Sequence, residues 1–248
     1  MNTITIEQVD KMAVITLSGS VTNPVSRDLV RELSEALDDV KQHARGLVLT
    51  GGEKFFSIGL NLPELLTLNR AEMSDFWPRF IGVCFDLYTL PMPTGAAVTG
   101  HAPAAGTIFA IACDFRYVAE GKKLMGLNEV KIGIPTPYLA DLMLRQIVGD
   151  RVATEMLYTG AFFMPEQALQ MNLVDQVHPQ DAVLPSMIER ISGLASFYPE
   201  AFQAMKKARI EDVVAKYHRN VEAYHEMFLD CWFSDFTQSA LKKAAENF

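Results

Sequence analysis

The chain has 248 residues, of which 49% are hydrophobic and 21% charged, so it can bury a sizeable core. Its formal net charge of -8 provides no long-range attraction to nucleic acid or to an anionic membrane, and neither partner is expected. No apolar run reaches the roughly 18 residues of a membrane helix. The N-terminus also lacks the basic and apolar pattern of a signal peptide. These features predict a soluble, cytoplasmic protein.

Two common kinds of site find no support in the sequence. The three cysteines, Cys84, Cys113 and Cys231, are widely spaced and match no zinc or redox motif, so we expect reduced thiols and no metal site. Neither a Gly-x-Gly-x-x-Gly fingerprint nor a P-loop is present, which argues against nucleotide binding by those devices.

The first half of the chain alternates strand-like and helix-like patterns. Short alternating or apolar runs predict strands at residues 3–8, 13–17, 46–50, 94–98, 115–119 and 124–125. The first two runs are separated only by Asp10 and Lys11, which indicates an opening hairpin. Apolar residues at helical spacing predict helices at residues 26–42, 70–90 and 107–112.

Strand signals nearly disappear after residue 137, apart from one run at residues 173–177. Helical patterns predominate at residues 139–163, 165–171, 183–197 and from 199 to the C-terminus. The sequence therefore predicts an α/β fold, with a core at residues 1–190 and a helical region at residues 191–248.

Three segments combine glycine-containing turns with strand ends, namely residues 54–62, 98–107 and 123–135. Turns of this kind can direct free backbone N–H groups into a shared crevice. In the second segment the turn precedes a helix, whose first N–H groups lack intrahelical partners. Such donors stabilise an oxyanion without a charged side chain. Any one of these segments alone is more often a simple tight turn.

The order of the three segments is more specific. Residues 56–62, Phe-Ser-Ile-Gly-Leu-Asn-Leu, resemble the Phe-Ser-Ala-Gly-x-Asp-Leu loop of the crotonase (enoyl-CoA hydratase/isomerase) family. Residues 100–106 resemble its Gly-x-Ala-x-Gly-Gly-Gly loop, and residues 113–114 its Cys-Asp pair. Residues 126–129, Gly-Leu-Asn-Glu, followed by Gly-Ile, are closest in motif to the 3,2-trans-enoyl-CoA isomerases. The similarity extends along essentially the whole chain.

The resemblance implies an α/β spiral of ββα units with a C-terminal helical trimerisation region at residues 191–248. It also implies a homotrimer or dimer of trimers and a substrate carried as a coenzyme A thioester, with no permanently bound cofactor. The backbone N–H groups of Ile58 and Ala105 would form the oxyanion hole, and Glu129 would be the catalytic carboxylate. Candidate contacts to the acyl-CoA are Arg27, Ser57, Gly59, Leu60, Asn61 and Asn128.

Two departures from the family pattern affect the expected chemistry. The first catalytic glutamate of the hydratases would fall at Ile108, which cannot ionise, so only Glu129 remains. One carboxylate suffices to move a double bond from position 3 to position 2, by taking a proton from C2 and returning it to C4. Ala104 and Ala105 replace glycines in the second loop, and alanine resists positive φ angles.

Several alternative functions remain open at this stage. Hydration of an enoyl-CoA is the runner-up and is disfavoured by Ile108. A decarboxylase or a carbon–carbon bond enzyme could use the same enolate with a single glutamate. A relative that binds acyl-CoA without catalysis is a further possibility, which the alanines at residues 104 and 105 leave open.

Overall fold

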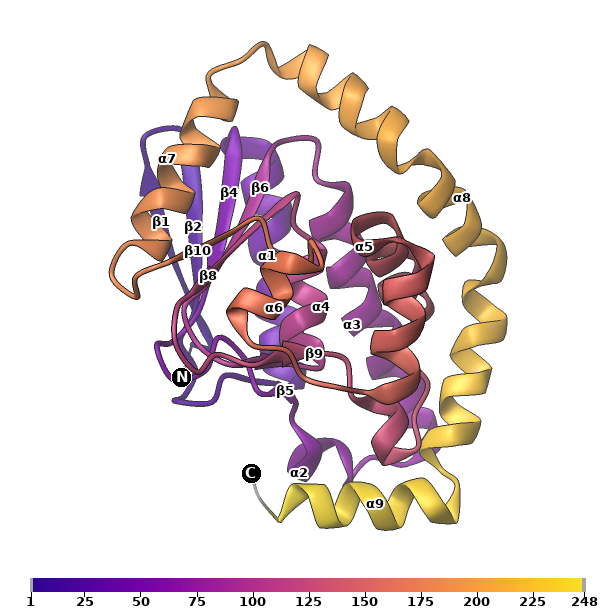
Figure 1. The fold of residues 1–248 in the computed structure, drawn as a ribbon. Helices are drawn as coiled ribbons and strands as arrows, with labels where there is room; N and C mark the ends of the chain where they lie inside the picture. The colour runs from indigo at the N-terminus through magenta and orange to yellow at the C-terminus, as the bar shows by residue number, and fades with distance from the viewer. Residues whose placement is uncertain (1, 247–248) are drawn as a thin grey trace.

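The computed structural model describes residues 2–246, and its central element is a six-stranded sheet in the order β1-β2-β4-β6-β8-β10 (Figure 1). The strands of this sheet are β1 (Ile4–Val9), β2 (Met12–Leu17), β4 (Gly46–Thr50), β6 (Thr94–Val98), β8 (Phe115–Ala119) and β10 (Gln176–His178). β1 and β2 form the predicted antiparallel hairpin, and every later pairing is parallel. Parallel neighbours require crossover segments, and the helices supply them.

The helices agree closely with the sequence patterns. They are α1 (Arg27–His43), α2 (Leu62–Leu65), α3 (Arg70–Thr89), α4 (Ala105–Ile111), η1 (Glu129–Ile132), α5 (Tyr138–Thr159), α6 (Pro165–Gln170), α7 (Val183–Ala195), α8 (Pro199–Trp232) and α9 (Asp235–Ala245). Local signals explain their start points: the Ser26 hydroxyl accepts a hydrogen bond from the Leu29 N–H at 3.1 Å, which caps α1.

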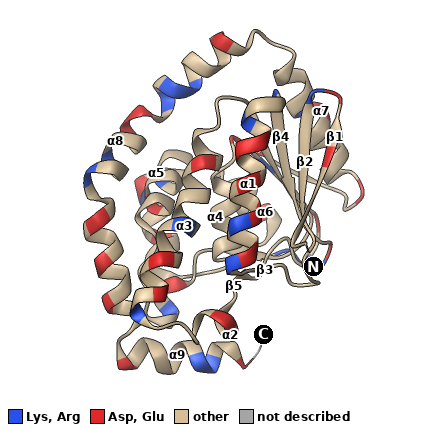
Figure 2. Cartoon of the chain, turned by 180° about the vertical axis from the view of Figure 1, so that it is seen from behind, with Lys and Arg blue, Asp and Glu red and all other residues tan. Residues whose placement is uncertain are grey.

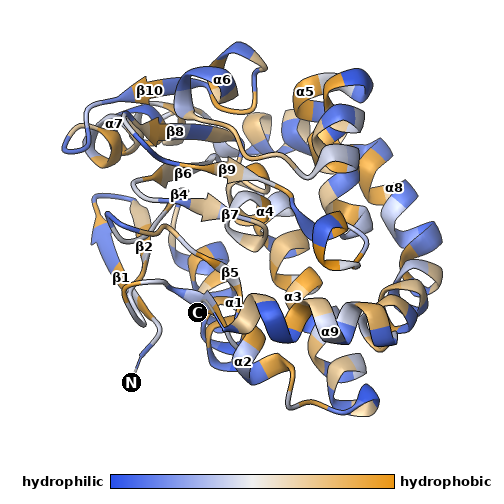
Figure 3. Cartoon of the chain, turned by 60° about the horizontal axis from the view of Figure 1, so that its bottom comes forward, coloured by the Kyte–Doolittle hydropathy of each residue, from blue (hydrophilic) through white to orange (hydrophobic). Residues whose placement is uncertain are grey.

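Helices cover both faces of the sheet. α7 lies on one face, where Met187 and Ile191 pack against the central strands. Gly95 in β6 is required there, because a Cβ at that position would collide with Met187. α1, α3 and α4 belong to the larger core cluster on the other face. Figure 3 shows the edge strand β1 as largely hydrophilic beside the hydrophobic β2, in agreement with their exposed and buried residues.

The C-terminal region differs from the prediction in two respects. The single helix expected from residue 199 onward is two helices, because the chain turns at Phe233 and the Ser234 hydroxyl caps α9 by accepting from the Thr237 N–H at 3.3 Å. The predicted boundary at residue 190 falls inside α7, whose residues on both sides of it pack on the sheet.

α8 has 34 residues and runs along the outside of the molecule past α3 and α5 (Figure 1). Figure 2 shows acidic and basic residues interspersed along it, as expected for a solvated face. One partly buried ion pair fixes its first half to the core, since the buried Lys206 Nζ lies 2.8 Å from Oδ2 of Asp114, the residue before β8. No helix within residues 2–246 is both long enough and apolar enough to cross a membrane.

Two short parallel pairs lie beside the main sheet. β3 (Pro24–Val25) pairs with β5 (Gly59–Leu60), and β7 (Ala102–Pro103) pairs with β9 (Met125–Gly126). The three glycine-containing segments identified in the sequence contribute β5, β7 and β9. The pairing of β7 with β9 holds the second and third segments side by side, and an isolated parallel bridge between Phe55 and His101 joins the first segment to the second.

Candidate active site

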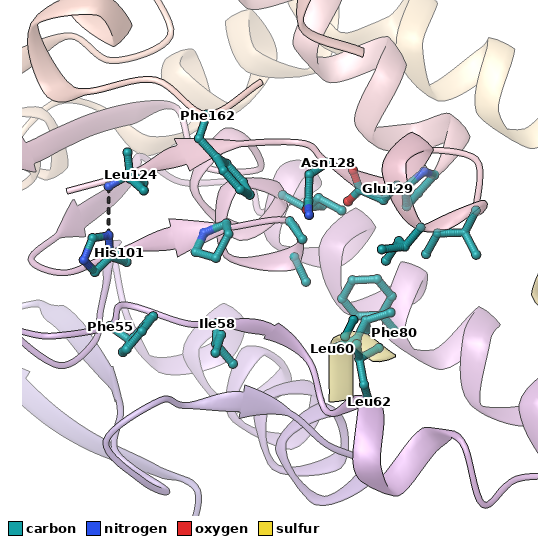
Figure 4. A pocket seen from close by; sticks show the side chains of 18 of the residues that line it. Phe55, Ile58, Leu60, Leu62, Phe80, His101, Leu124, Asn128, Glu129 and Phe162 are labelled. Atoms are coloured by element: carbon teal, nitrogen blue, oxygen red, sulfur yellow. Dashed lines mark hydrogen bonds between the residues drawn. The ribbon is translucent and has the colours of Figure 1, made fainter. Parts of the chain in front are cut away.

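A cavity of about 610 Å³ opens where the three glycine-containing segments meet α3 and α4 (Figure 4). Most of its wall is apolar. Figure 4 shows Phe55, His101 and Leu124 at one end of the cavity and Glu129 at the other. The lining residues are Phe55, Ile58, Leu60, Leu62, Trp77, Phe80, His101, Pro103, Ala104, Ala105, Ile108, Leu124, Asn128, Glu129, Ile132, Ile134, Pro137, Phe162 and Ala244.

Buried polar contacts hold the first loop in place. The Ser57 hydroxyl donates to the Asn23 carbonyl at 2.8 Å and accepts from the Gly59 N–H at 3.2 Å. The Asn23 amide in turn donates to the Leu17 carbonyl at 2.8 Å, at the end of β2. Ser57 is fully buried and does not line the cavity. The structure therefore places this predicted substrate contact inside the loop, where it shapes the turn.

The sequence predicted the Ile58 N–H as the first oxyanion donor, and this prediction is wrong. The Ile58 N–H already donates to the Thr22 carbonyl at 2.8 Å, so it is not available to a ligand. The Asn61 N–H likewise donates to Val25 in β3 at 3.0 Å. Successive residues of a strand direct their N–H groups to opposite edges, so the Leu60 N–H points away from β3. Leu60 is the residue of this loop whose N–H faces the second loop.

The two loops pack closely at Gly59. This residue has a φ of +102°, which favours glycine, and an added Cβ would lie 3.2 Å from Ala104 Cβ and 3.6 Å from the Ala105 nitrogen. β5 is thus held between β3 on one edge and the start of α4 on the other. Gly59, predicted as a substrate contact, does not line the cavity and permits this close approach instead.

The second loop places the N-terminus of α4 at the cavity. Ala104 donates its N–H to the Gly126 carbonyl at 2.8 Å and has a φ of +50° and a ψ of -119°. The unfavourable backbone conformation expected from the loss of glycine is therefore carried by Ala104. Ala105 is the first residue of α4, and N–H groups at this position have no intrahelical acceptor. Ala105 lines the cavity, where its N–H is suited to an oxyanion.

Glu129 combines burial with an incomplete set of hydrogen bonds. Its side chain belongs to the first residue of η1 and the residue is only 4% exposed. Burial raises the pKa of Glu129 to about 7, although its own backbone N–H and the Thr136 hydroxyl partly oppose this by stabilising the carboxylate. The Oε2 atom has no hydrogen-bond partner within the described part of the chain. A carboxyl group with such a pKa is suited to exchanging protons at neutral pH.

The C-terminal helix α9 supports the segment that carries Glu129. The Thr237 hydroxyl donates to the Gly133 carbonyl at 2.9 Å, at the end of η1. Gly133 has a φ of +81°, and any side chain there would collide with Thr237. Ala244, near the end of α9, lines the cavity directly. The sequence offered no signal for this arrangement, because the contacting residues lie about a hundred positions apart.

Ile108 and Asn128 both line the cavity, the first from α4 and the second from the position directly before Glu129. Ile108 is 2% exposed, and Glu129 is the one carboxylate among the described lining residues. Asn128 precedes η1 without capping it, since its side chain makes no capping hydrogen bond. Its position in the cavity wall is compatible with the predicted contact to the acyl-CoA.

Arg27 and Asn61 lie outside the cavity wall. Arg27 Nε is 3.0 Å from Glu64 Oε1, and the Asn61 amide donates to Glu64 Oε2 at 3.1 Å. Both side chains, which were predicted to contact acyl-CoA, thus interact with one carboxylate of α2. These interactions fix the loop between β5 and α2, and the predicted contact of both residues with acyl-CoA stays a prediction.

His101 marks the end of the cavity opposite Glu129. Its Nδ1 accepts a hydrogen bond from the Leu124 N–H at 3.1 Å, so the neutral ring carries its proton on Nε2. Burial lowers the pKa of His101, and the nearby charges of Lys123, Lys122 and Lys54 lower it further. Three lysines therefore surround this end of the cavity in a chain that is acidic overall.

Comparison with known proteins shows which family the chain belongs to. The profile of the family described as Enoyl-CoA hydratase/isomerase matches residues 7–247. The chain belongs to this family. It is 33% identical to mouse mitochondrial enoyl-CoA delta isomerase 1 over 176 residues, which span 69% of this chain and 61% of the mouse protein. It is also 33% identical to a probable enoyl-CoA hydratase of Mycobacterium avium over 175 residues, which span 69% of this chain and 67% of that protein.

The fold comparison points to the same family of enzymes. The crystal structure of human mitochondrial delta3-delta2-enoyl-CoA isomerase superposes with a TM-score of 0.94 and 26% identity, covering 99% of this chain and 97% of that chain. The predicted crotonase fold is therefore confirmed, with its C-terminal helices. Within this member of the enoyl-CoA hydratase/isomerase family, the cavity between the two loops and Glu129 is the candidate active site.

Proposed function

We propose that this enzyme moves a double bond from position 3 to position 2 of an enoyl-CoA. The observation that carries the proposal is the composition of the cavity wall, in which Glu129 is the one carboxylate among the described residues and Ile108 is apolar. Similarity to proteins named as isomerases supports the same choice. Hydration requires a water molecule to be both oriented and deprotonated, whereas isomerisation needs only one group that exchanges a proton.

The proposed reaction proceeds in two proton transfers. The Glu129 carboxylate takes a proton from C2, and the electrons of the C2–H bond move into the thioester to form a dienolate. Glu129 then returns the proton to C4, so that the double bond lies between C2 and C3 and no atom is gained or lost. The pKa of about 7 suits both steps, because neither protonation state of Glu129 is strongly preferred at neutral pH.

The negative charge of the dienolate would lie on the thioester oxygen. The backbone N–H groups of Leu60 and Ala105 are the proposed donors, since Leu60 faces away from β3 and Ala105 begins α4. Each donor in such a site contributes about 3 kcal/mol to the transition state. Leu60 thereby replaces Ile58 in the oxyanion hole proposed for this chain.

The charges around the cavity suggest how the coenzyme A moiety lies. Lys54, Lys122 and Lys123 surround the end formed by Phe55 and His101. We propose that the phosphates of coenzyme A lie at this end and that the acyl chain extends past Glu129 to the other. Local cations are needed for this, because the net charge of -8 disfavours an anionic ligand at long range.

Product analysis with two substrates tests the proposed reaction. The purified protein is incubated with a 3-enoyl-CoA and, separately, with a 2-enoyl-CoA, and the products are followed by chromatography. We expect 2-enoyl-CoA from the first substrate, and we expect the rate to fall by about 10²–10⁴-fold in Glu129→Gln. Glu120→Gln, an exposed glutamate beyond β8, is the matched control and should retain full activity.

Other products would identify the alternatives. Formation of 3-hydroxyacyl-CoA without isomerisation would establish a hydratase and overturn the proposal. Binding of both acyl-CoA compounds without turnover would instead indicate a non-catalytic relative. A decarboxylase or carbon–carbon bond enzyme would leave both substrates unchanged and would act on an acyl-CoA that carries a further carbonyl or carboxyl group.

We propose, as the resemblance implies, that the chain forms a homotrimer or a dimer of trimers. Support comes from large apolar side chains exposed in the helical region, namely Phe197, Tyr198, Met205, Tyr224, Met227 and Phe236. Association would remove these side chains from water. Light scattering coupled to size-exclusion chromatography measures the mass, and a monomer of 27.6 kDa would contradict this expectation.

A further inference from the structure

A second cavity, of about 540 Å³, lies behind the active site. Three parts of the fold enclose it: the middle of α3, the segment from Pro135 to the start of α5, and the second half of α8. Its wall is mainly apolar. Apart from Thr136, whose hydroxyl interacts with Glu129, the proposed isomerase reaction uses no residue that lines only this cavity.

The two cavities adjoin each other at two shared residues. Trp77 of α3 and Pro137, which precedes α5, line both of them. The neighbouring residues on α3 divide between the cavities, since Phe80 lines the first and Ile81 the second. Thr136, whose hydroxyl interacts with Glu129, lines the second cavity. The second cavity therefore begins next to the catalytic carboxylate, at the end of the first cavity opposite the lysines.

Aromatic rings separate the cavities. The Trp77 ring stacks on Phe228 of α8 with centroids 3.4 Å apart and planes inclined by 4°, and it lies 5.5 Å from the Phe80 ring. The partition thus consists of uncharged side chains. The acidic residues of the second cavity, Glu222 and Glu226, come from α8, where Glu226 is 66% exposed and lies 3.2 Å from Arg70. A hydrocarbon chain would meet charge only at the outer rim.

The helix that carries Trp77 is weakened at the partition. Pro78 lies inside α3 and has no N–H, so the helical hydrogen bond to the Ser74 carbonyl cannot form. The side chain of the same residue contacts α8, since the Ser74 hydroxyl lies 3.1 Å from His225 Nε2. Displacement of Trp77 therefore breaks one helical bond fewer than it would elsewhere in α3.

We propose that the second cavity receives the distal part of a long acyl chain and that Trp77 is the residue separating short-chain from long-chain substrates. This inference rests on the proposed function, because it places the acyl end of the same substrate. A short chain ends in the first cavity and does not pass Trp77. A long chain passes between Trp77 and Pro137 and lies against Ile81, Leu139 and Val221.

Filling the second cavity tests the proposal. Val221 lines it from α8, so Val221→Trp reduces its volume without touching the first cavity. Val214→Trp is the matched control, since Val214 is a partly buried residue of the same helix that lines a different groove. The measured quantity is kcat/KM for 3-hexenoyl-CoA and for 3-hexadecenoyl-CoA. We expect Val221→Trp to lower the long-chain value about tenfold or more and to leave the short-chain value unchanged.

Trp77→Phe provides an independent variant that retains an aromatic ring in the partition. We expect it to change the ratio of the long-chain to the short-chain kcat/KM, because the smaller ring opens the partition at which only a long chain passes. An equal effect of Val221→Trp on both substrates, or the same long-chain loss in Val214→Trp, would overturn the proposal.

Binding separates this inference from the proposed reaction. The Kd values of hexanoyl-CoA and hexadecanoyl-CoA are measured by calorimetry for the wild-type chain and for Val221→Trp. Preferential loss of hexadecanoyl-CoA binding supports the inference even where no isomerisation is observed. Isomerisation of both chain lengths with unchanged Kd values in Val221→Trp would refute the inference and leave the proposed function in place.

Discussion

Ile108 and Glu129 line one cavity, the first from α4 and the second from η1, so an apolar side chain and a buried carboxyl group border the same space. Both residues are almost completely buried. An ionised partner at residue 108 would repel the Glu129 carboxylate, and its absence leaves burial as the main cause of the raised pKa of Glu129.

Introducing a second carboxylate by Ile108→Glu should therefore change both the reaction and its pH dependence. We expect measurable conversion of 2-enoyl-CoA to 3-hydroxyacyl-CoA, because two carboxylates can orient and deprotonate water. We also expect the pH midpoint of isomerisation to rise, since two like charges disfavour each other's ionisation. Ile108→Gln is the control with similar size and polarity and no charge. Absence of hydration in a folded Ile108→Glu variant would contradict the first expectation.

The rate of isomerisation in the wild-type chain should increase with pH. Glu129 must be ionised to take the C2 proton, and burial raises its pKa to about 7. A plot of kcat/KM for a 3-enoyl-CoA against pH should rise with a midpoint near 7 and then level off. A midpoint near the ordinary value of 4.5 would show that the free enzyme does not hold Glu129 in the environment described above.

Ionisation of Glu129 should also affect the free energy of unfolding. The reaction rate should rise with pH, whereas this contribution to stability should fall. Burial raises the folded-state pKa of Glu129 from 4.5 to about 7, so the folded protein is penalised as pH rises through this interval. Glu129→Gln cannot ionise and escapes the penalty. Relative to the wild type, its free energy of unfolding should rise between pH 4 and pH 8, by at most about 3 kcal/mol. Urea unfolding at both pH values measures this, and a constant difference would contradict it.

The proposed oxyanion donor, the Ala105 N–H at the start of α4, can be removed without removing a side-chain contact. Proline is tolerated at the first position of a helix, so Ala105→Pro deletes the N–H and retains the helical φ. We expect kcat to fall by about 10²–10³-fold. Ala105→Ser retains the N–H and should keep most of the activity. Circular dichroism verifies that both variants are folded, and a fully active, folded Ala105→Pro would exclude this donor.

Local patterns were sufficient for much of this molecule. Alternating or continuous apolar runs predicted the hairpin and the buried strands, and helical spacing predicted α1, because these signals act between neighbours in the chain. The glycine-containing loops and the Gly-Leu-Asn-Glu segment identified the family and Glu129. The loss of the second acid at Ile108 was also readable from the sequence.

Contacts between residues far apart in the chain determined the features of the site that the sequence did not predict. The direction of an N–H group depends on the partner of its strand, so only the tertiary structure shows that the Ile58 N–H is engaged by Thr22 and that the Asn61 N–H is engaged by Val25. Leu60 became the proposed donor for this reason. The support of η1 by Thr237 and the second cavity behind Trp77 likewise join residues far apart in the chain. Periodicity and motif spacing describe one segment at a time, whereas these features arise from the packing of several segments on one another.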